Sequence, residues 1–210
     1  MFSENYNVYL RVLEEDDWQY SINWRKDETI WEMVMGQKYY VSECYERQWV
    51  KEHIENQNKN MVFVVYEKNT DKTIGYVYLN NIDHKNKKCG LEKLLGDRES
   101  WGKGYGTQMT MLVLHYAFYE LGVQRVEASQ LTTNKASIKV NEKCGFKNEG
   151  IARQAVFKNG RFVDINLMGC LKDDFDKLLE NLYKDGGGYN YHIVFIPLAA
   201  RFQKTEAAYV

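Results

Sequence analysis

The feature that most constrains this chain is a glycine-rich turn, Trp101–Thr107, with three glycines at alternate positions. A strand-like run, Lys87–Leu95, precedes it, and a helix-like run, Thr107–Leu121, follows it. Glycine lets a backbone adopt positive φ and approach a ligand closely. A glycine turn that opens a helix also aims unpaired N–H groups and the positive end of the helix dipole at one point. Such a point suits an anion, best of all a pyrophosphate, although a tight strand–helix connection explains the pattern equally well.

Two common phosphate-binding motifs do not match this turn. A P-loop requires Gly-x-x-x-x-Gly-Lys-Ser/Thr, whereas Lys103 stands between the glycines with no hydroxyl residue after it. The Rossmann fingerprint, Gly-x-Gly-x-x-Gly, belongs to a first βαβ unit, whereas the spacing here is Gly-x-Gly-x-Gly in mid-chain. The remaining pattern resembles the acetyl-CoA pyrophosphate loop of the GNAT superfamily of N-acetyltransferases, with Trp101 where a Gln or Arg is usual.

Length and composition favour one globular domain with a substantial core. The chain has 210 residues, of which 44% are apolar and 27% charged, and its net charge is −1. This balance predicts no nucleic-acid partner and no anionic membrane surface. The N-terminus has no signal-peptide pattern, and no apolar run approaches the length of a membrane span, so we expect a cytoplasmic protein.

The cysteines favour the same compartment. No Cys-x-x-Cys pair occurs, which predicts buried, reduced thiols at Cys44, Cys89, Cys144 and Cys170. The histidines do not cluster with them at zinc-ligand spacing, so no metal site is expected.

Periodicity predicts a mixed α/β chain. Helices are expected after Glu14–Asp17, after the N-cap Ser42, over Thr107–Leu121 and after the N-cap Asn134. Asn159-Gly160 is typical of a tight hairpin turn. The expected strands are Tyr6–Leu13, Met61–Tyr66, Lys72–Ile82, Lys87–Leu95, Gln124–Leu131, Phe146–Phe157 and Phe162–Leu171.

A second group of motifs makes the family resemblance specific. Leu10–Asp16 and the Asn159-Gly160-Arg161 turn with Asp164 bracket it, so it covers about residues 8 to 174. The segments similar to the ribosomal-protein N-terminal acetyltransferase branch are Arg125–Ser129, Asn134–Ile138, Glu142–Phe146 and Glu149-Gly150.

The resemblance implies a twisted, mostly antiparallel seven-stranded sheet with about four flanking helices, whose fourth and fifth strands splay apart. It implies acetyl-CoA as co-substrate, with the pantetheine arm in the splay and the pyrophosphate on the glycine turn. The cofactor-binding residues implied are Leu94, Leu95, Trp101, Gly102, Lys103, Gly104, Tyr105, Gly106, Thr107, Asn134 and Ser137.

Acetyl transfer to an amine needs a neutral amine, a stabilised oxyanion and a protonated leaving thiolate. Many relatives use a Tyr for the last task, but Asn141 holds its position here, and an amide cannot replace a phenol as an acid. Ser137 is therefore our candidate beside the sulfur, with a simple helix-start hydroxyl as the alternative. Glu127 and Glu92 are candidate bases. Glu127 could equally form an ion pair with Arg125 or a lysine, Glu92 could face solvent, and water could replace both.

The function expected is transfer of an acetyl group to a primary amine, either a protein N-terminus or a small molecule such as a polyamine or amino sugar. A catalytically silent acyl-CoA sensor is the alternative that Asn141 keeps open. Trp24, Trp31, Tyr39 and Tyr40 either pack in the core or line the acceptor pocket. Residues 1–184 are expected to form the domain, and residues 185–210 a tail that is loosely packed or pairs with a second subunit in a homodimer.

Overall fold

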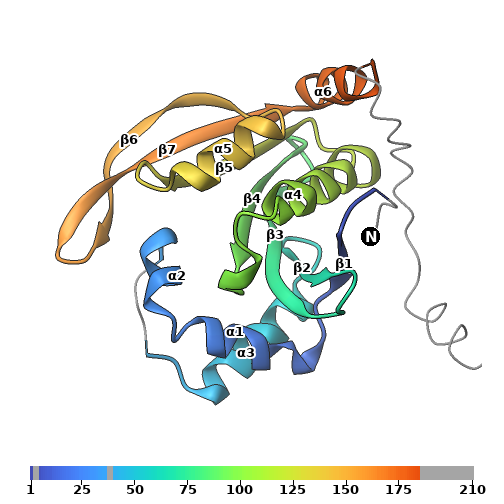
Figure 1. Ribbon diagram of the computed structural model, residues 1–210. Coiled ribbons are helices and arrows are strands. Elements are labelled where there is room, and N and C mark those ends of the chain that lie inside the picture. Colours follow the sequence, from blue (N-terminus) through green and yellow to red (C-terminus); the bar gives the residue numbers. More distant parts are fainter. Residues whose placement is uncertain (2–4, 37–39, 185–210) are drawn as a thin grey trace, which may run out of the picture.

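The computed structural model describes residues 1, 5–36 and 40–184 and shows a mixed α/β fold around one twisted sheet (Figure 1). In the described residues the sheet has seven strands in the order β1-β2-β3-β4-β5-β7-β6, and only the β4–β5 pair is parallel. This confirms the predicted sheet. The strands are β1 Val8–Val12, β2 Met61–Glu67, β3 Thr73–Asp83, β4 Lys88–Leu95, β5 Arg125–Leu131, β6 Lys147–Lys158 and β7 Arg161–Leu171.

The described part of the chain has six α-helices, two more than the sequence predicted. Both Ser42 and Asn134 cap their helices as expected, because their side chains accept hydrogen bonds from the N–H groups of Tyr45 and Ser137. The missed helices are the six-residue α2 and the C-terminal α6. The helices are α1 Trp18–Trp24, α2 Glu28–Met33, α3 Glu43–Glu55, α4 Tyr105–His115, α5 Lys135–Lys143 and α6 Lys172–Lys184.

The predicted helix over Thr107–Leu121 begins two residues earlier and is not uniform. It is α-helical as far as His115 and continues as a π-helical turn over Tyr116–Glu120. Gly122, at φ +63, ends it in the left-handed conformation that favours glycine. The hairpin prediction is confirmed, since Asn159 and Gly160 both have positive φ between β6 and β7.

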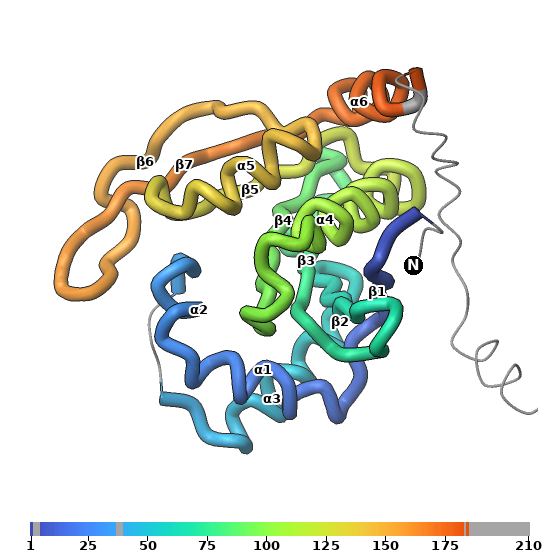
Figure 2. The backbone as a smooth tube through the Cα atoms, in the orientation of Figure 1, coloured from blue at the N-terminus to red at the C-terminus, as the bar shows by residue number. Residues whose placement is uncertain are grey.

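Two hydrophobic clusters cover the two faces of the sheet. The larger lies under α4 and includes Met109, Leu112, Phe118 and, from α6, Phe175. The smaller lies between β2–β3 and the N-terminal helices and centres on Tyr76, Val64 and Val50. Figure 2 shows the same division, with α4 and α5 on one side and α1 to α3 gathered at the other.

The sheet opens between β4 and β5. Only three residue pairs join these strands, Lys88 with Arg125, Cys89 with Val126 and Gly90 with Glu127. Beyond Gly90, β4 continues to Leu95 along β3, while β5 continues along β7. The predicted splay is therefore confirmed, and five residues of β4 border the opening.

The sequence also led to expectations about membrane spans, the cysteines and the C-terminal tail. No helix in the described ranges is long and apolar enough to cross a membrane. Cys89, Cys144 and Cys170 are buried free thiols as predicted, but Cys44 is exposed because it faces outward from the first turn of α3. The expected tail, residues 185–210, lies outside the described residues.

Candidate active site

The glycine turn has the geometry that an anion site requires. Gly102 and Gly104 have φ of +77° and +82°, a region that strains other residues. A Cβ added to either glycine would meet no atom within 4 Å, so conformation rather than crowding calls for glycine. Gly104 directly precedes α4, and no side chain in the described structure caps the first-turn N–H groups. The Thr107 N–H donates to the Gly104 carbonyl at 3.1 Å, whereas the N–H groups of Tyr105 and Gly106 can donate to a ligand oxygen.

Side chains of the turn fix it to the sheet. The Trp101 indole N–H donates to the carbonyl of Leu95 at 2.9 Å. Tyr105 donates to the Glu67 carboxylate at 2.6 Å, and the Lys103 ammonium lies 3.9 Å from the same oxygen. The Tyr105 hydrogen bond, more than any other contact, lowers the pKa of Glu67, so this carboxylate remains ionised beneath the turn.

Helix α5 packs against the start of α4 through Val140, and the polar groups at the start of α5 differ in availability. The Asn134 side chain is engaged within the protein, because its Oδ1 accepts from the Ser137 N–H at 3.0 Å and its Nδ2 donates to the Met33 carbonyl at 2.9 Å. Ser137 is half-buried, and its hydroxyl makes no hydrogen bond within the described structure. A Cβ built on Gly106 would lie 3.5 Å from Val140, so glycine permits close contact between α4 and α5.

A cavity of about 400 Å³ lies on the opposite side of β4, between this strand, β3 and the helices α1 to α3. Trp24 and Trp31 line it, as the sequence suggested. Tyr40 does not line it and is 95% exposed, while Tyr39 lies outside the described residues. The lining includes the aromatic residues Trp24, Trp31, Trp49 and Tyr78 and, from β4, Glu92 and Leu94.

Glu92 brings a negative charge to this pocket. Its carboxylate accepts a hydrogen bond from the Asn80 amide at 2.7 Å and forms no ion pair in the described structure. A Cβ on Gly90 would lie 2.0 Å from Asn80 Oδ1, so glycine at that position makes room for the orienting amide. The lining residue Arg25 is paired with the fully buried Glu46 at 2.7 Å.

Glu127 has different surroundings. It lies at the joined end of the splay, where it pairs with Gly90 in the sheet, and it does not line the pocket. Its carboxylate is 3.0 Å from Arg125 Nε and 3.5 Å from Lys88 Nζ. The ion pair that the sequence allowed as an alternative is thus present.

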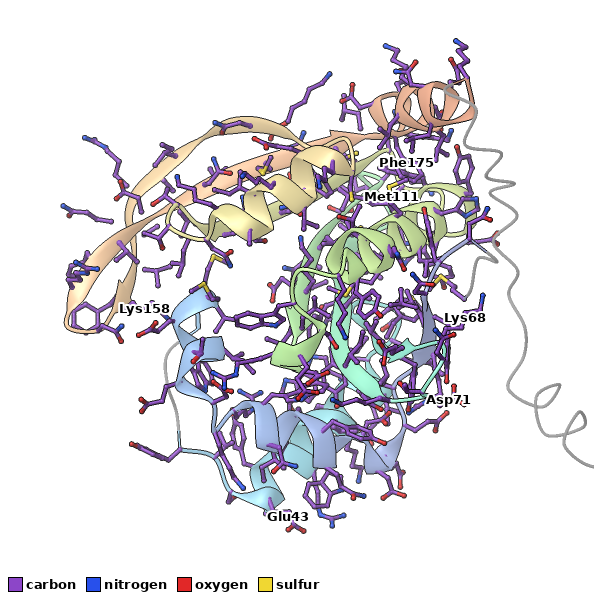
Figure 3. The ribbon with its side chains drawn as sticks, viewed as in Figure 1. Glu43, Lys68, Asp71, Met111, Lys158 and Phe175 are labelled. Carbon is purple, nitrogen blue, oxygen red and sulfur yellow. The ribbon has the colours of Figure 1, made fainter. Side chains whose placement is uncertain are left out.

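Two lysines near the site, Lys93 and Lys158, were not predicted from the sequence. Lys93, on β4, is half-buried and donates a hydrogen bond to the side-chain oxygen of Asn141 on α5. Lys158, at the tip of the β6–β7 hairpin, donates to the carbonyls of Trp31 and, at 2.8 Å, Val34 at the end of α2 (Figure 3). A lysine in a strand normally indicates a solvent-facing position, so neither pattern gave a signal.

Comparison with known proteins agrees with this geometry. Residues 7–147 match the family model described as an acetyltransferase (GNAT) domain. The chain is 31% identical over 173 residues to the probable N-acetyltransferase YjcK of Bacillus subtilis, covering 80% of this chain and 95% of that protein. It is 32% identical over 102 residues to the ribosomal N-acetyltransferase-like protein YdaF of Bacillus subtilis, covering 49% and 55%.

A solved structure shows the same fold. Spermidine N-acetyltransferase from Vibrio cholerae, crystallised with CoA and spermine, superposes with a TM-score of 0.74 at 25% identity, covering 80% of this chain and 98% of that one. The family match spans more than half of the sequence, and the splayed strands β4 and β5 and the glycine turn lie within it. This chain therefore belongs to the GNAT acetyltransferase family and is an N-acetyltransferase.

Proposed function

We propose that this chain moves an acetyl group from acetyl-CoA directly to the primary amine of a small cationic molecule, with a polyamine as the leading class. One observation carries the proposal: the anion-binding turn and the aromatic pocket meet at the same open segment of β4. The turn is bonded to Leu95, and the pocket is lined by Glu92 and Leu94. A thioester bound along this segment and an amine in the pocket would be next to each other.

The residues present fit acetyl-CoA. The backbone N–H groups of residues 102–107 would hold its pyrophosphate, and the exposed ammonium of Lys103 would add charge. The backbone of Leu94 and Leu95, which lacks a β5 partner, would hydrogen-bond the pantetheine arm. Ser137 offers a free hydroxyl beside that arm, whereas Asn134 would contribute by holding α5 against α2. When bound, the thioester supplies the activated acetyl group.

The pocket favours a cationic acceptor. Indole and phenol rings attract an ammonium group over their faces, and the Glu92 carboxylate adds a full negative charge. Glu92 also lies where a base is needed, since the reacting nitrogen must lose a proton. Glu127 is held by two cations at the joined end of the splay, so we assign it a structural role ahead of the catalytic one.

The relatives support the polyamine class ahead of the others. The chain is 25% identical over 171 residues to the spermidine N(1)-acetyltransferase of Vibrio cholerae, covering 96% of that protein. A protein N-terminus, as the ribosomal relative suggests, and an amino sugar are the competing acceptors.

The test is CoA release from acetyl-CoA, read with a thiol reagent, against polyamines, amino sugars, aminoglycosides and short peptides. The proposal expects turnover with polyamines. Glu92→Gln should raise KM for a polyamine about 10-fold, because it removes about 1.4 kcal/mol of attraction in a partly solvated site, and should leave KM for acetyl-CoA unchanged. Glu142→Gln, an exposed carboxylate on α5, is the matched control.

The other possible results of this assay would each replace or overturn a part of the proposal. Turnover with peptides or amino sugars alone would replace the polyamine class with theirs. CoA binding without turnover of any acceptor would favour the acyl-CoA sensor, and absence of CoA binding would overturn the proposed use of the glycine turn.

A further inference from the structure

Lys93 occupies an unusual place for a lysine, inside the opening between β4 and α5. Side chains alternate along β4, so Lys93 shares a face with the buried residues Cys89 and Leu91, which pack under α4. Its side chain crosses the splay, and its ammonium group donates to the Asn141 side-chain oxygen. Any thioester lying along the open segment of β4 has this ammonium group beside it.

A chain of buried amides fixes the acceptor of that hydrogen bond. Asn141 is fully buried, and its Nδ2 donates to Gln130 Oε1 at 2.7 Å. Gln130 Nε2 in turn donates to Asn166 Oδ1 at 2.7 Å, and Asn166 Nδ2 donates to Asn148 Oδ1 at 3.0 Å. Because an ammonium group can only donate, the oxygen of Asn141 must face Lys93, and its Nδ2 then faces Gln130. The network contains no carboxylate, so the lysine is held in position without a counter-ion.

The surroundings of Lys93 make its ammonium group a stronger acid than that of an exposed lysine. Burial lowers the pKa of Lys93 to about 8. The titratable group that faces it from α5 is the Cys144 thiol, which raises this pKa, while the residues of β5 and β7 in the network are neutral amides. Among the described residues no carboxylate acts on Lys93, and Glu92 projects from the other face of β4. A group of this kind can both hold and give a proton near neutral pH.

We propose that Lys93 is a catalytic residue that protonates the sulfur leaving group, a role for which Asn141 has no proton to give. The inference rests on the proposed function. As the bond from the amine nitrogen to the carbonyl carbon forms and the carbon–sulfur bond breaks, Lys93 Nζ gives one proton to the sulfur, which keeps the bonding electron pair. The amine nitrogen loses its proton to Glu92, which passes it to solvent, and the neutral Lys93 regains a proton from solvent. Asn141 orients the ammonium group.

A direct test uses bound CoA rather than turnover. An ammonium beside the sulfur stabilises the thiolate, so the pKa of the bound CoA thiol should fall by about 1 or more relative to free CoA. Thiolate absorbance in the ultraviolet, followed against pH, reports this pKa. The protein's own thiols do not interfere if Cys44→Ser is the background, because burial raises the pKa of Cys89, Cys144 and Cys170 to about 12.

Lys93→Met should return the bound thiol to the pKa of free CoA and reduce kcat about 100-fold, the contribution expected of one positioned acid. Lys93→Arg should preserve the lowered thiol pKa, since the positive charge stays. Its kcat should nevertheless fall towards that of Lys93→Met, because a guanidinium group does not release its proton. The wild type itself should lose activity above about pH 8, where Lys93 deprotonates. Lys139→Met, an exposed lysine on α5, is the matched control.

Two results would overturn the inference: an unchanged thiol pKa in Lys93→Met with CoA still bound, or wild-type kcat with the same pH profile. Thermal unfolding of each variant identifies any loss caused by misfolding, and Lys93→Arg then decides. A wild-type protein that binds CoA but acetylates no acceptor refutes the proposed function instead, and the thiol titration still gives a result in that case.

Discussion

Lys158 shows how one side chain from a distant segment can hold a wall of the acceptor pocket. Its ammonium group donates hydrogen bonds to the carbonyls of Trp31 and Val34, which places a cation at the negative end of the short helix α2. Burial lowers its pKa, a cost that these hydrogen bonds offset. With only six residues, α2 has too few internal hydrogen bonds to persist alone, so such contacts decide its position.

Lys158→Met should therefore loosen α2 without unfolding the sheet. Loss of two charge-assisted hydrogen bonds costs about 1.5 kcal/mol locally, which corresponds to roughly 10-fold faster amide exchange in residues 28–33. The KM for the acceptor should rise, because Trp31 of the pocket lies on α2. Hydrogen exchange with Lys139→Met as control measures the effect, and unchanged exchange in α2 would contradict the role assigned to Lys158.

Residue-level prediction succeeded where chemistry is local. The caps Ser42 and Asn134 and the Asn159-Gly160 turn depend on their own neighbours, and all three were predicted. Lys93 and Lys158 depend on partners 48 and more than 120 residues away, which no local pattern indicates.

At the scale of elements, the glycine turn needs positive φ at Gly104 and is also the proposed pyrophosphate site. A comparison of two glycine variants can separate these two roles. Gly104 and Gly122 both have positive φ and open space around the missing Cβ, but only Gly104 begins α4 beside the proposed pyrophosphate site. Alanine at either position should cost about 1 kcal/mol of stability through backbone strain.

Gly104→Ala should in addition weaken CoA binding about 10-fold or more, because relief of the strain would turn the first N–H groups of α4 away from the phosphate. Gly122→Ala should bind CoA like the wild type. Calorimetric titration with CoA, together with urea unfolding of both variants, separates the two effects. Equal loss of CoA affinity in both variants would show that the turn acts through stability alone.

The missed elements have physical explanations of different kinds. The helix α2 is too short for a hydrophobic period, and its one local signal is the Asp27 carboxylate, which accepts from the Thr29 N–H at 2.9 Å. The helix α6 does have a periodic apolar face that packs on the core, namely Phe175, Leu178, Leu179 and Leu182. Its pattern was readable, whereas that of α2 was not.

At the scale of the whole molecule, the two halves of the sheet share three residue pairs and the core beneath α4. The resemblance to the family supplied the splay in advance. The sequence offered Trp24 and Trp31 as lining residues but not the rest of the pocket, because its lining comes from α1, α2, α3, β3 and β4, segments that only the folded chain brings together.

Stability of the whole fold should depend on His115 in mild acid. Burial lowers its pKa below the ordinary value of 6.5, and its Nδ1 has no hydrogen-bond partner in the described structure. The unfolded chain therefore takes up this proton at a higher pH than the folded chain does. Stability from this source is complete well above pH 6.5 and is lost as the pH falls from about 6.5 towards the lower, folded-state pKa.

Urea unfolding between about pH 7 and 5 should show this decline in the wild type, and His115→Gln should flatten it. His84→Gln, at an exposed histidine, should leave the slope unchanged. A slope that persists in His115→Gln would assign the decline to another group.

The contacts between Lys158 and α2 also determine when the pocket can form during synthesis. Trp31 and Val34 are synthesised 127 and 124 residues before Lys158, whose ammonium group donates to their carbonyls. At ordinary translation rates that interval is on the order of 10 s. During this interval α2 lacks its hydrogen bonds from Lys158, so we expect the proposed acceptor pocket to be incomplete in a nascent chain that already contains β1 to β5. The acceptor pocket is completed only after the β6–β7 hairpin has been made.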